Sequence, residues 1–299
     1  MTDPGRPAEP ARDGNSAVTS GPEASTRREA LAAAALRLAS VSDTPRLDAE
    51  LLMAEALGIA RESMLLQPVE GDVPPAFDGL LQRRLAHEPI AYILGRRAFW
   101  TIELEVGPGV LVPRPDSETL IEAAVEHFGA RAPGSILDLG TGPGTLLLAA
   151  LAQWPASSGL GIDCSEPALA FARRNAERLG FSGRAHFQRG NWGEGLEGRF
   201  DLVLCNPPYV ASNAALPADV SRWEPAGALF AGEEGLDDYR RLAPQLSALL
   251  KPGGIACVEI GSGQRNAVTT LFSQQGFTIS SRADLNKVAR CLVLVIDRE

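Results

Sequence analysis

The chain has few cysteines and no long apolar stretch. Its 299 residues include four cysteines, Cys164, Cys205, Cys257 and Cys291, which lie far apart and form no CxxC pair. This spacing favours neither a disulfide framework nor a metal site, so we expect buried thiols in a reducing compartment. The longest apolar runs, such as LLLAALAQW, are too short to cross a bilayer, and the N-terminus lacks the apolar core of a secretory signal. We therefore expect a cytoplasmic protein with no membrane partner.

An excess of basic residues is also absent. The formal net charge is −9 and the isoelectric point is about 5.0, whereas hydrophobic residues make up 45% and charged residues 22% of the chain. The latter two values are ordinary for a globular protein with its own core. The negative charge argues against a broad phosphate-binding face, although a local basic patch remains compatible with it. Direct binding of nucleic acid is therefore not expected.

The composition changes along the chain and predicts several domains. Residues 1–26 are rich in Pro, Gly, Ser and Ala, which predicts a disordered tail. Apolar residues then recur at three- and four-residue steps up to about residue 88, which indicates a small helical bundle. We assign residues 27–95 to this helical domain. From the pattern alone, its role is equally well that of a structural cap or of a surface that docks a partner.

A β-hairpin linker is predicted for residues 96–115. The alternation over residues 99–106 suggests one strand, residues 107–109 a turn, and residues 110–112 a return strand. Asp116 or Ser117 then has the right chemistry to cap a helix that runs to about Phe128.

Residues 116–299 show an alternation of strands and helices. Strand-like segments are SILDLG, SGLGID, RAHFQRG, FDLVLCN and IACVEIG, with helical segments between them. Such alternation predicts an α/β fold with a doubly wound, mostly parallel, Rossmann-like sheet. Two last strands, FTISSRA and RCLVLVID, are separated by a short connection and should pair antiparallel at the sheet edge, giving seven strands.

A glycine-rich turn follows the first strand of this sheet. Gly140-Thr141-Gly142-Pro143-Gly144 reads G-x-G-x-G and departs from the G-x-G-x-x-G of dinucleotide sites. Asp163 ends the second strand, where a carboxylate can accept both hydroxyls of a ribose, and Asp138 is placed to meet an ammonium group. A ligand with a ribose and an ammonium but no phosphates is S-adenosylmethionine. The alternative is a glycine turn without a ligand.

Asn191 and Trp192 follow the third strand, where the adenine of such a ligand would lie. Trp192 has the chemistry to stack on a base, but an ordinary buried aromatic residue is as good an interpretation.

The fourth strand ends in Asn206-Pro207-Pro208-Tyr209. In a doubly wound sheet, ligands bind beyond the carboxyl ends of the strands, so this tetrad should lie beside the glycine turn. The Asn206 side-chain oxygen and the Pro207 backbone carbonyl can accept both N–H bonds of a planar NH2 group, and Tyr209 can stack on that group. These contacts would aim a delocalised nitrogen lone pair at a methyl group without a strong base. The alternative is a loop whose prolines merely end the strand.

Several long motifs, taken together, resemble one family. The chain from Arg27 onward is similar to the protein-(glutamine) methyltransferases that modify class 1 peptide chain release factors. The motifs are HEPIAYILGRRAFW (87–100), GVLVPRPDSETLIE (109–122), ILDLGTGPG (136–144), NPPYV (206–210) and RWEPAGALFAGEEGLDDYR (222–240).

The resemblance implies roles for individual residues. Residues 140–144, Asp163, Asn191, Trp192 and Asn206 would contact S-adenosylmethionine. Residues 206–209 would hold the glutamine amide of the release factor's Gly-Gly-Gln motif, while the helical domain grips the release factor elsewhere. A monomer is expected. Pro143 and Asn191 depart from the Ser and Asp that are frequent in the family, and residues 223–239 could pack over the active-site mouth or take part in catalysis.

Two other functions compete with this interpretation. One is a methyltransferase of adenine or guanine amino groups in nucleic acid, which would share the tetrad but should carry a basic face or a base-flipping apparatus. The other is a module that binds the cofactor without catalysis, which an intact Asn-Pro-Pro-Tyr beside a glycine turn makes a weaker hypothesis.

Overall fold

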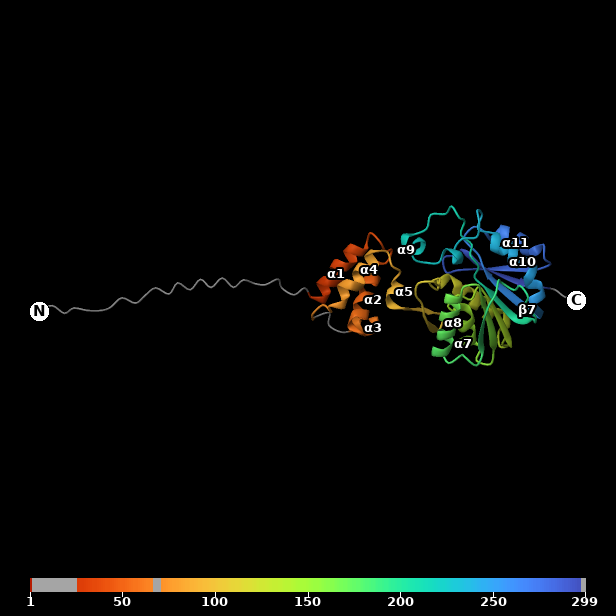
Figure 1. The fold of residues 1–299 in the computed structure, drawn as a ribbon, viewed down its shortest axis with the longest axis horizontal. Helices are drawn as coiled ribbons and strands as arrows, with labels where there is room; N and C mark the ends of the chain where they lie inside the picture. The colour runs from red at the N-terminus through yellow and green to blue at the C-terminus, as the bar shows by residue number, and fades with distance from the viewer. Residues whose placement is uncertain (2–25, 67–70, 297–299) are drawn as a thin grey trace.

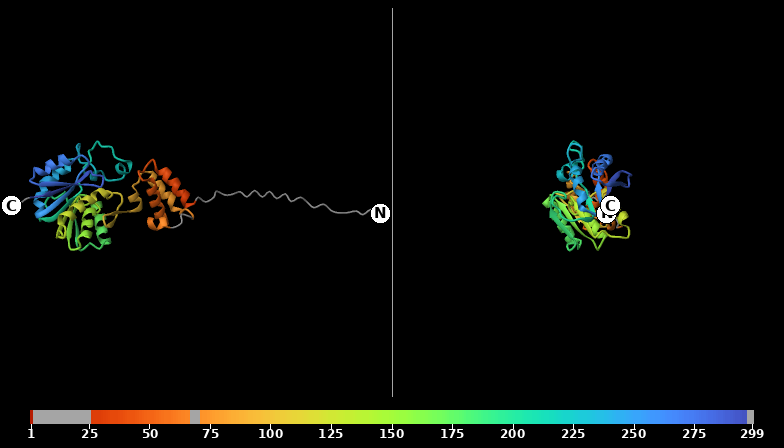
Figure 2. Two further views of the ribbon diagram at one scale, coloured as in Figure 1. Left: turned by 180° about the vertical axis from the view of Figure 1, so that it is seen from behind. Right: turned by 90° about the vertical axis from the view of Figure 1, so that its right-hand side faces the viewer.

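The computed structural model describes Met1 and residues 26–66 and 71–296. The predicted disordered tail, residues 1–26, therefore lies outside the described residues apart from its two ends. In the described ranges, no helix combines the length and the apolar character needed to span a membrane. The helical bundle lies at one end of the molecule and the large sheet at the other, as Figures 1 and 2 show.

The N-terminal helices form where the apolar periodicity predicts them. They are α1 (Arg27–Leu38), α2 (Pro45–Leu57), α3 (Arg61–Leu66), α4 (Ala76–Leu85) and α5 (Ile90–Leu94). Thr26 and Glu29 form a capping box that begins α1, and Pro45 occupies the first position of α2, where its missing N–H costs nothing. Leu31, Leu38 and Leu52 are among the buried side chains of their shared core.

The bundle contains a buried ion pair, and its arginine also contacts a residue outside the bundle. Arg84 on α4 donates to Asp48 on α2 at 2.8 Å, and both side chains are about 95% buried because their exposures are 6% and 5%. The same guanidinium donates to Asp219 at 3.4 Å, which lies on the short helix α9 (Ala218–Ser221) after the fourth strand of the large sheet. Arg84 therefore connects the bundle to α9.

The hairpin linker exists, but its predicted register is wrong. The structure pairs β1 (Arg96–Phe99) antiparallel with β2 (Ile102–Glu105), so the turn lies at Trp100 and Thr101 and the strand does not continue through residues 99–106. Trp100 adopts a positive φ of 54°, and its N–H donates to Glu118 at 2.8 Å. The Glu118 carboxylate therefore accepts the hydrogen bond of the Trp100 N–H at a turn where the alternation alone predicted an unbroken strand.

The predicted return strand, residues 110–112, is also absent from the structure. Its backbone groups are bonded to side chains: the Tyr92 hydroxyl donates to the Val110 carbonyl, and the Val112 N–H donates to Glu224 at 3.1 Å. Val110 and Val112 are nevertheless buried, so their apolar pattern reflects packing of an irregular segment.

The seven-stranded, mostly parallel sheet is confirmed. Its strands are β3 (Ser135–Leu139), β4 (Ser158–Asp163), β5 (Ala185–Arg189), β6 (Phe200–Cys205), β7 (Leu250–Glu259), β8 (Thr278–Ala283) and β9 (Ala289–Val295). They are ordered β5-β4-β3-β6-β7-β9-β8. The first five are parallel, β9 is antiparallel to β7, and the predicted antiparallel pair of β8 and β9 forms the edge.

Helices cover both faces of this sheet. One face carries α6 (Glu118–Phe128), α7 (Thr145–Gln153) and α8 (Glu166–Arg178), and the other carries α10 (Asp237–Leu249) and α11 (Arg265–Ser273). Two separate buried clusters fill the layers between helices and sheet. The strand order reverses between β3 and β6, and ligands bind at such a switch point in doubly wound sheets.

We expect Arg84→Met to lower the free energy of unfolding by about 3–5 kcal/mol, because it leaves the Asp48 carboxylate buried without its partner. Urea denaturation would measure the loss. The double variant Arg84→Met/Asp48→Leu should recover most of it. Arg37→Met is the matched control, since Arg37 pairs with Asp78 at 3.9 Å with both side chains exposed, and its cost should stay below about 1 kcal/mol. Equal losses for the two single variants would contradict the argument.

Candidate active site

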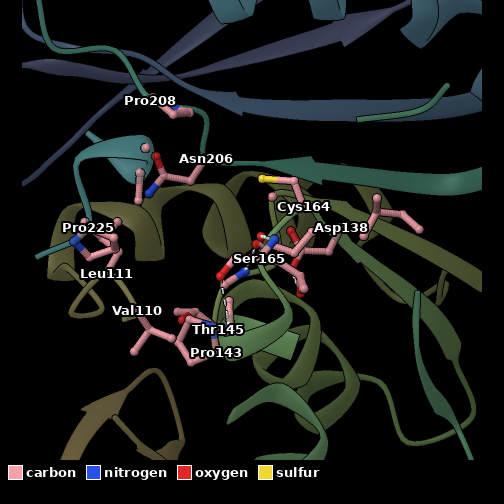
Figure 3. A pocket seen from close by; sticks show the side chains of 18 of the residues that line it. Val110, Leu111, Asp138, Pro143, Thr145, Cys164, Ser165, Asn206, Pro208 and Pro225 are labelled. Carbon is pink, nitrogen blue, oxygen red and sulfur yellow. Dashed lines mark hydrogen bonds between the residues drawn. The ribbon is translucent and has the colours of Figure 1, made fainter. Parts of the chain in front are cut away.

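A cavity of about 570 Å³ opens at the switch point. Its walls come from the ends of β3, β4 and β6, from residues 109–117 after the hairpin, and from residues 225–230. Figure 3 shows Asn206 and Pro208 on one wall, with Val110, Leu111, Pro143, Thr145, Cys164, Ser165 and Pro225 around them. Segments far apart in the sequence therefore share one chamber.

The glycine turn follows β3 and lines the cavity. Gly140 has a φ of +73°, and a side chain there would meet the Trp192 ring at 3.1 Å. Gly144, at φ +87°, would clash with Leu148 at 2.8 Å. The N–H groups of Gly140 and Thr141 both donate to the Ile162 carbonyl at 2.9 Å. Glycine is thus required at both ends of the turn by conformation and by close approach.

Asp138 lies under this turn and is only 1% exposed. Its Oδ2 accepts from the Thr141 hydroxyl at 2.6 Å and from the Leu147 N–H at 3.2 Å, while Oδ1 has no partner in the described part of the chain. Burial raises the pKa of Asp138 to about 7, against the hydrogen bonds from Thr141 and Leu147. The carboxyl therefore fastens the glycine turn to α7, and Oδ1 is the atom left for a ligand such as an ammonium group.

Asp163 ends β4 and lines the cavity. Its two oxygens accept from the Ser165 N–H and the Gly142 N–H, each at 2.8 Å. Burial raises the pKa of this carboxyl, and the backbone donors lower it. Each oxygen keeps a further lone pair, so the carboxylate can still accept from hydroxyl groups of a ligand.

Trp192 and Asn191 line the cavity beyond β5. Trp192 has a positive φ of 53° and packs its ring against Gly140. Its indole hydrogen-bonds Asp238 on α10, where burial raises the pKa of the carboxyl and the Trp192 contact lowers it. Asn191 is exposed and its Nδ2 donates to Glu194 at 2.9 Å, which leaves the oxygen of its side-chain amide for a ligand.

The tetrad at the end of β6 divides into two parts. Asn206 and Pro208 line the cavity, whereas Pro207 is buried and does not. The Tyr209 ring packs against Gly261, and its hydroxyl donates to Glu259 at 3.2 Å. Tyr209 and Pro207 are not among the cavity-lining residues here, so stacking on a substrate and acceptance by the Pro207 carbonyl stay predictions.

Ser117 has a different role from the predicted cap. It occupies the position before α6 but its side chain makes no capping hydrogen bond. Instead its Oγ accepts from the Asn206 Nδ2 at 3.0 Å. The helix start therefore reaches a site residue 89 positions away, a contact that spacing in the sequence cannot reveal.

Residues 223–239 contact the linker and contribute lining residues to the cavity. Glu224, 6% exposed, pairs with Arg114 and accepts from the Val112 N–H, while Pro225 and Phe230 line the chamber. Burial raises the pKa of Glu224 and Arg114 lowers it. These contacts hold the segment against the linker, and both roles predicted for it, packing over the mouth and catalysis, stay predictions.

The cysteines are placed partly as expected. Cys205, Cys257 and Cys291 are buried free thiols, but Cys164 is exposed and lines the cavity, contrary to the expectation for all four. It follows Asp163 at the strand end, where the chain turns out of the sheet into α8. In the described residues, no three His, Cys, Asp or Glu side chains are arranged to hold a metal ion.

Comparison with known proteins gives the class of the C-terminal part. A family model described as a methyltransferase domain matches residues 132–289, and one described as the PrmC N-terminal domain matches residues 29–95. A methyltransferase structure from Pyrococcus furiosus has a TM-score of 0.51 at 18% identity, covering 73% of this chain and 98% of that one. That likeness shows the fold. The chain is thus a methyltransferase by family.

Similar full-length proteins narrow the assignment. The release factor glutamine methyltransferase of Rhodospirillum rubrum is 43% identical over 264 residues, which are 86% of this chain and 81% of the relative. That of Caulobacter vibrioides is 42% identical over 242 residues, 79% of this chain and 84% of the relative. The chain belongs to the release factor glutamine methyltransferase family, as its motifs suggest.

We expect Asp163→Ala to weaken the binding of S-adenosylmethionine while the fold stays intact by circular dichroism. Losing charge-assisted hydrogen bonds to a ribose should cost about 1.5–3 kcal/mol, which is roughly a 10- to 150-fold rise in Kd by calorimetry. Glu166→Ala is the matched control, because Glu166 is a neighbouring exposed carboxylate that pairs with Arg173. A Kd unchanged in the Asp163 variant would contradict the assignment.

Proposed function

We propose that this protein transfers a methyl group from S-adenosylmethionine to the side-chain amide nitrogen of the glutamine in the Gly-Gly-Gln motif of class 1 release factors. Membership of the release factor glutamine methyltransferase family supports the substrate. One contact in the site supports the chemistry: the Asn206 Nδ2 donates to Ser117. The Asn206 Oδ1 is therefore the amide atom left to accept from a substrate in the cavity.

The residues present fit the proposed cofactor. The cavity of about 570 Å³ combines the glycine turn, the Asp163 carboxylate and the free Oδ1 of Asp138, which suit a backbone approach, a ribose and an ammonium group. Trp192 packs over Gly140 at the same wall. When bound, S-adenosylmethionine supplies an electrophilic methyl group on a sulfonium sulfur. Gly140, Thr141, Gly142, Pro143, Gly144, Asp163, Asn191, Trp192 and Asn206 are the proposed contacts.

The protein's task is to orient a weak nucleophile. An amide nitrogen shares its lone pair with the carbonyl, so attack requires both N–H bonds to be held away from the methyl group. The Asn206 Oδ1 and the Pro207 carbonyl would accept these bonds, and Pro208 and Tyr209 would contact the substrate amide. With S-adenosylmethionine bound as the methyl donor, the same acceptors would stabilise the positive charge that develops on the amide nitrogen, and the methylated nitrogen would lose its proton to water.

The alternative substrate is an amino group of a nucleic acid, because such enzymes share the tetrad. The names of the relatives and the net charge of −9 both favour the protein substrate. We also propose that the enzyme is monomeric. We propose that it is cytoplasmic, because release factors act in translation termination.

The helical domain, residues 27–95, is the proposed docking surface for the release factor. In the described part of the chain, four of the five exposed leucines lie on it: Leu36, Leu47, Leu65 and Leu66, with Leu285 elsewhere. We propose these leucines, on α1, α2 and α3, as candidate contacts for the release factor. The hairpin linker, residues 96–115, would set the distance between this surface and the cavity, and residues 116–299 would form the methyltransferase domain.

We expect Asn206→Ala to reduce single-turnover methylation of a purified release factor by about 10²–10³-fold, because one preorganised acceptor is lost. Radiolabelled methyl transfer with peptide mapping measures the rate and the modified residue. Affinity for S-adenosylmethionine should stay within about tenfold. Asn206→Asp keeps an acceptor oxygen and should retain more activity than Asn206→Ala. Turnover of the Ala variant within about threefold of wild type would refute the amide clamp.

We expect Leu36→Asp to raise KM for the release factor roughly fivefold or more, because docking would then bury an unpaired carboxylate at the interface. Binding of S-adenosylmethionine should not change. Leu285→Asp is the control, because Leu285 is also exposed but lies in the turn between β8 and β9. If the two variants have the same KM, this part of the bundle does not dock the substrate.

A further inference from the structure

A buried carboxyl group lies directly behind the tetrad. Glu259 ends β7 and is 1% exposed. Its Oε1 accepts from the Tyr209 hydroxyl at 3.2 Å, and its backbone carbonyl accepts from the Tyr239 hydroxyl at 2.9 Å. The other carboxyl oxygen, Oε2, makes no hydrogen bond of standard geometry to the described residues. It therefore keeps lone pairs available for a hydroxyl donor beside it.

Ser117 stands between this carboxyl and the tetrad. Its side chain is buried at 2% exposure, and its Oγ accepts from the Asn206 Nδ2 at 3.0 Å. Ser117 also lowers the pKa of the Glu259 carboxyl, so its hydroxyl is a donor within reach of that carboxyl, whose Oε2 has no other partner among the described residues. A hydroxyl has one proton to donate. If that proton goes to Glu259, Ser117 can only accept from Asn206.

We propose that Glu259 and Ser117 are positioning residues that fix which atom of the Asn206 amide faces the substrate. The ionised carboxylate accepts from Ser117, Ser117 accepts from the Asn206 Nδ2, and the Asn206 Oδ1 is left to face the cavity. An amide turned by 180° would present its NH2 group, which cannot accept from the substrate's N–H bonds. This inference rests on the proposed function of Asn206 as an acceptor for the glutamine amide.

Several groups set the charge of Glu259. Burial raises the pKa of Glu259 to about 7, Ser117 and Tyr209 lower it by hydrogen bonding, Asp116 raises it and Arg290 lowers it. The ionisable groups that face it from the neighbouring elements are Asp116, Cys205, Tyr209, Tyr239, Arg290 and Cys291. Burial raises the pKa of Tyr209 well above its usual range, so its hydroxyl stays a donor to Glu259 at neutral pH.

The direction of the pH dependence follows. Above about pH 7 Glu259 is ionised and accepts from Ser117. Below it, the protonated carboxyl can donate to Ser117, whose own proton is then free to reach the Asn206 Oδ1 and reverse the amide. The rate of methyl transfer should therefore fall as the pH drops through about 7, with the affinity for S-adenosylmethionine unchanged.

The test is single-turnover methylation of a release factor between pH 5.5 and 8.5. Glu259→Gln keeps the shape but places an NH2 donor against Ser117 at every pH. We expect its rate at pH 8 to fall on the order of 10-fold or more, as expected when a preorganised acceptor is misdirected, and its pH profile to be flat. The KM for the release factor and the Kd for S-adenosylmethionine should change less than twofold.

Two further variants keep the test decisive if Glu259→Gln is unstable. Ser117→Ala removes the connecting hydroxyl and should lose the rate and the pH dependence together, whereas Ser117→Thr retains the hydroxyl and should recover most of the rate. Tyr239→Phe is the matched control: it removes a hydrogen bond to the backbone of Glu259 and should lower Tm while leaving the pH profile of the rate as in wild type.

The outcomes separate the two proposals. A wild type that does not methylate a glutamine refutes the proposed function and this inference with it. A wild type that does so, with Ala and Thr at position 117 equally active or with a wild-type rate and pH profile for Glu259→Gln, overturns the positioning role alone.

Discussion

The pairing of β3 with β6 is the constraint on which the site depends. Because Asp138 pairs with Leu204 and Leu139 with Cys205, the two strands end together, and the glycine turn and the tetrad leave the sheet side by side. Parallel pairing at a reversal of strand order opens a space between the connections that diverge above it. The other residues that line the cavity, from the linker to α10, surround these two strand ends.

The linker and residues 222–240 complete the chamber through polar contacts instead of strand pairing. Glu224 holds Arg114 and the Val112 N–H, and Tyr92 holds the Val110 carbonyl. Arg84 adds a contact from the helical bundle to α9 on the same connection. The buried Glu224 and Arg84 thus link the linker and the bundle to the connection after β6, and removing either should cost more than removing one partner of an exposed pair.

The sequence predicts what is periodic or local. Strand and helix alternation predicted the sheet and its antiparallel edge, and the G-x-G-x-G spacing of residues 140–144 predicted the turn. The hairpin register was wrong because alternation over residues 99–106 cannot show that the Trp100 N–H finds an acceptor in Glu118, nor that Val110 and Val112 bond to side chains. Ser117, which lines the cavity, and Glu259, which we propose as a positioning residue, were missed for the same reason. Their partners lie 89 and 50 residues away, and a lone Ser or Glu carries no periodic signal.

The burial of Glu259 has a chemical reason if its charge directs the neighbouring hydroxyl. A carboxyl group without a solvent shell is costly unless it is hydrogen-bonded, and β7 could end in an apolar residue at no such cost. A neutral acceptor in its place, such as an amide, could donate as well as accept and would leave the Ser117 proton undirected. A carboxylate accepts only. A buried carboxylate at this position thus fixes the direction of the hydrogen bonds from Ser117 and Asn206. A reaction that depends on which atom of an amide faces the substrate requires such a fixed direction.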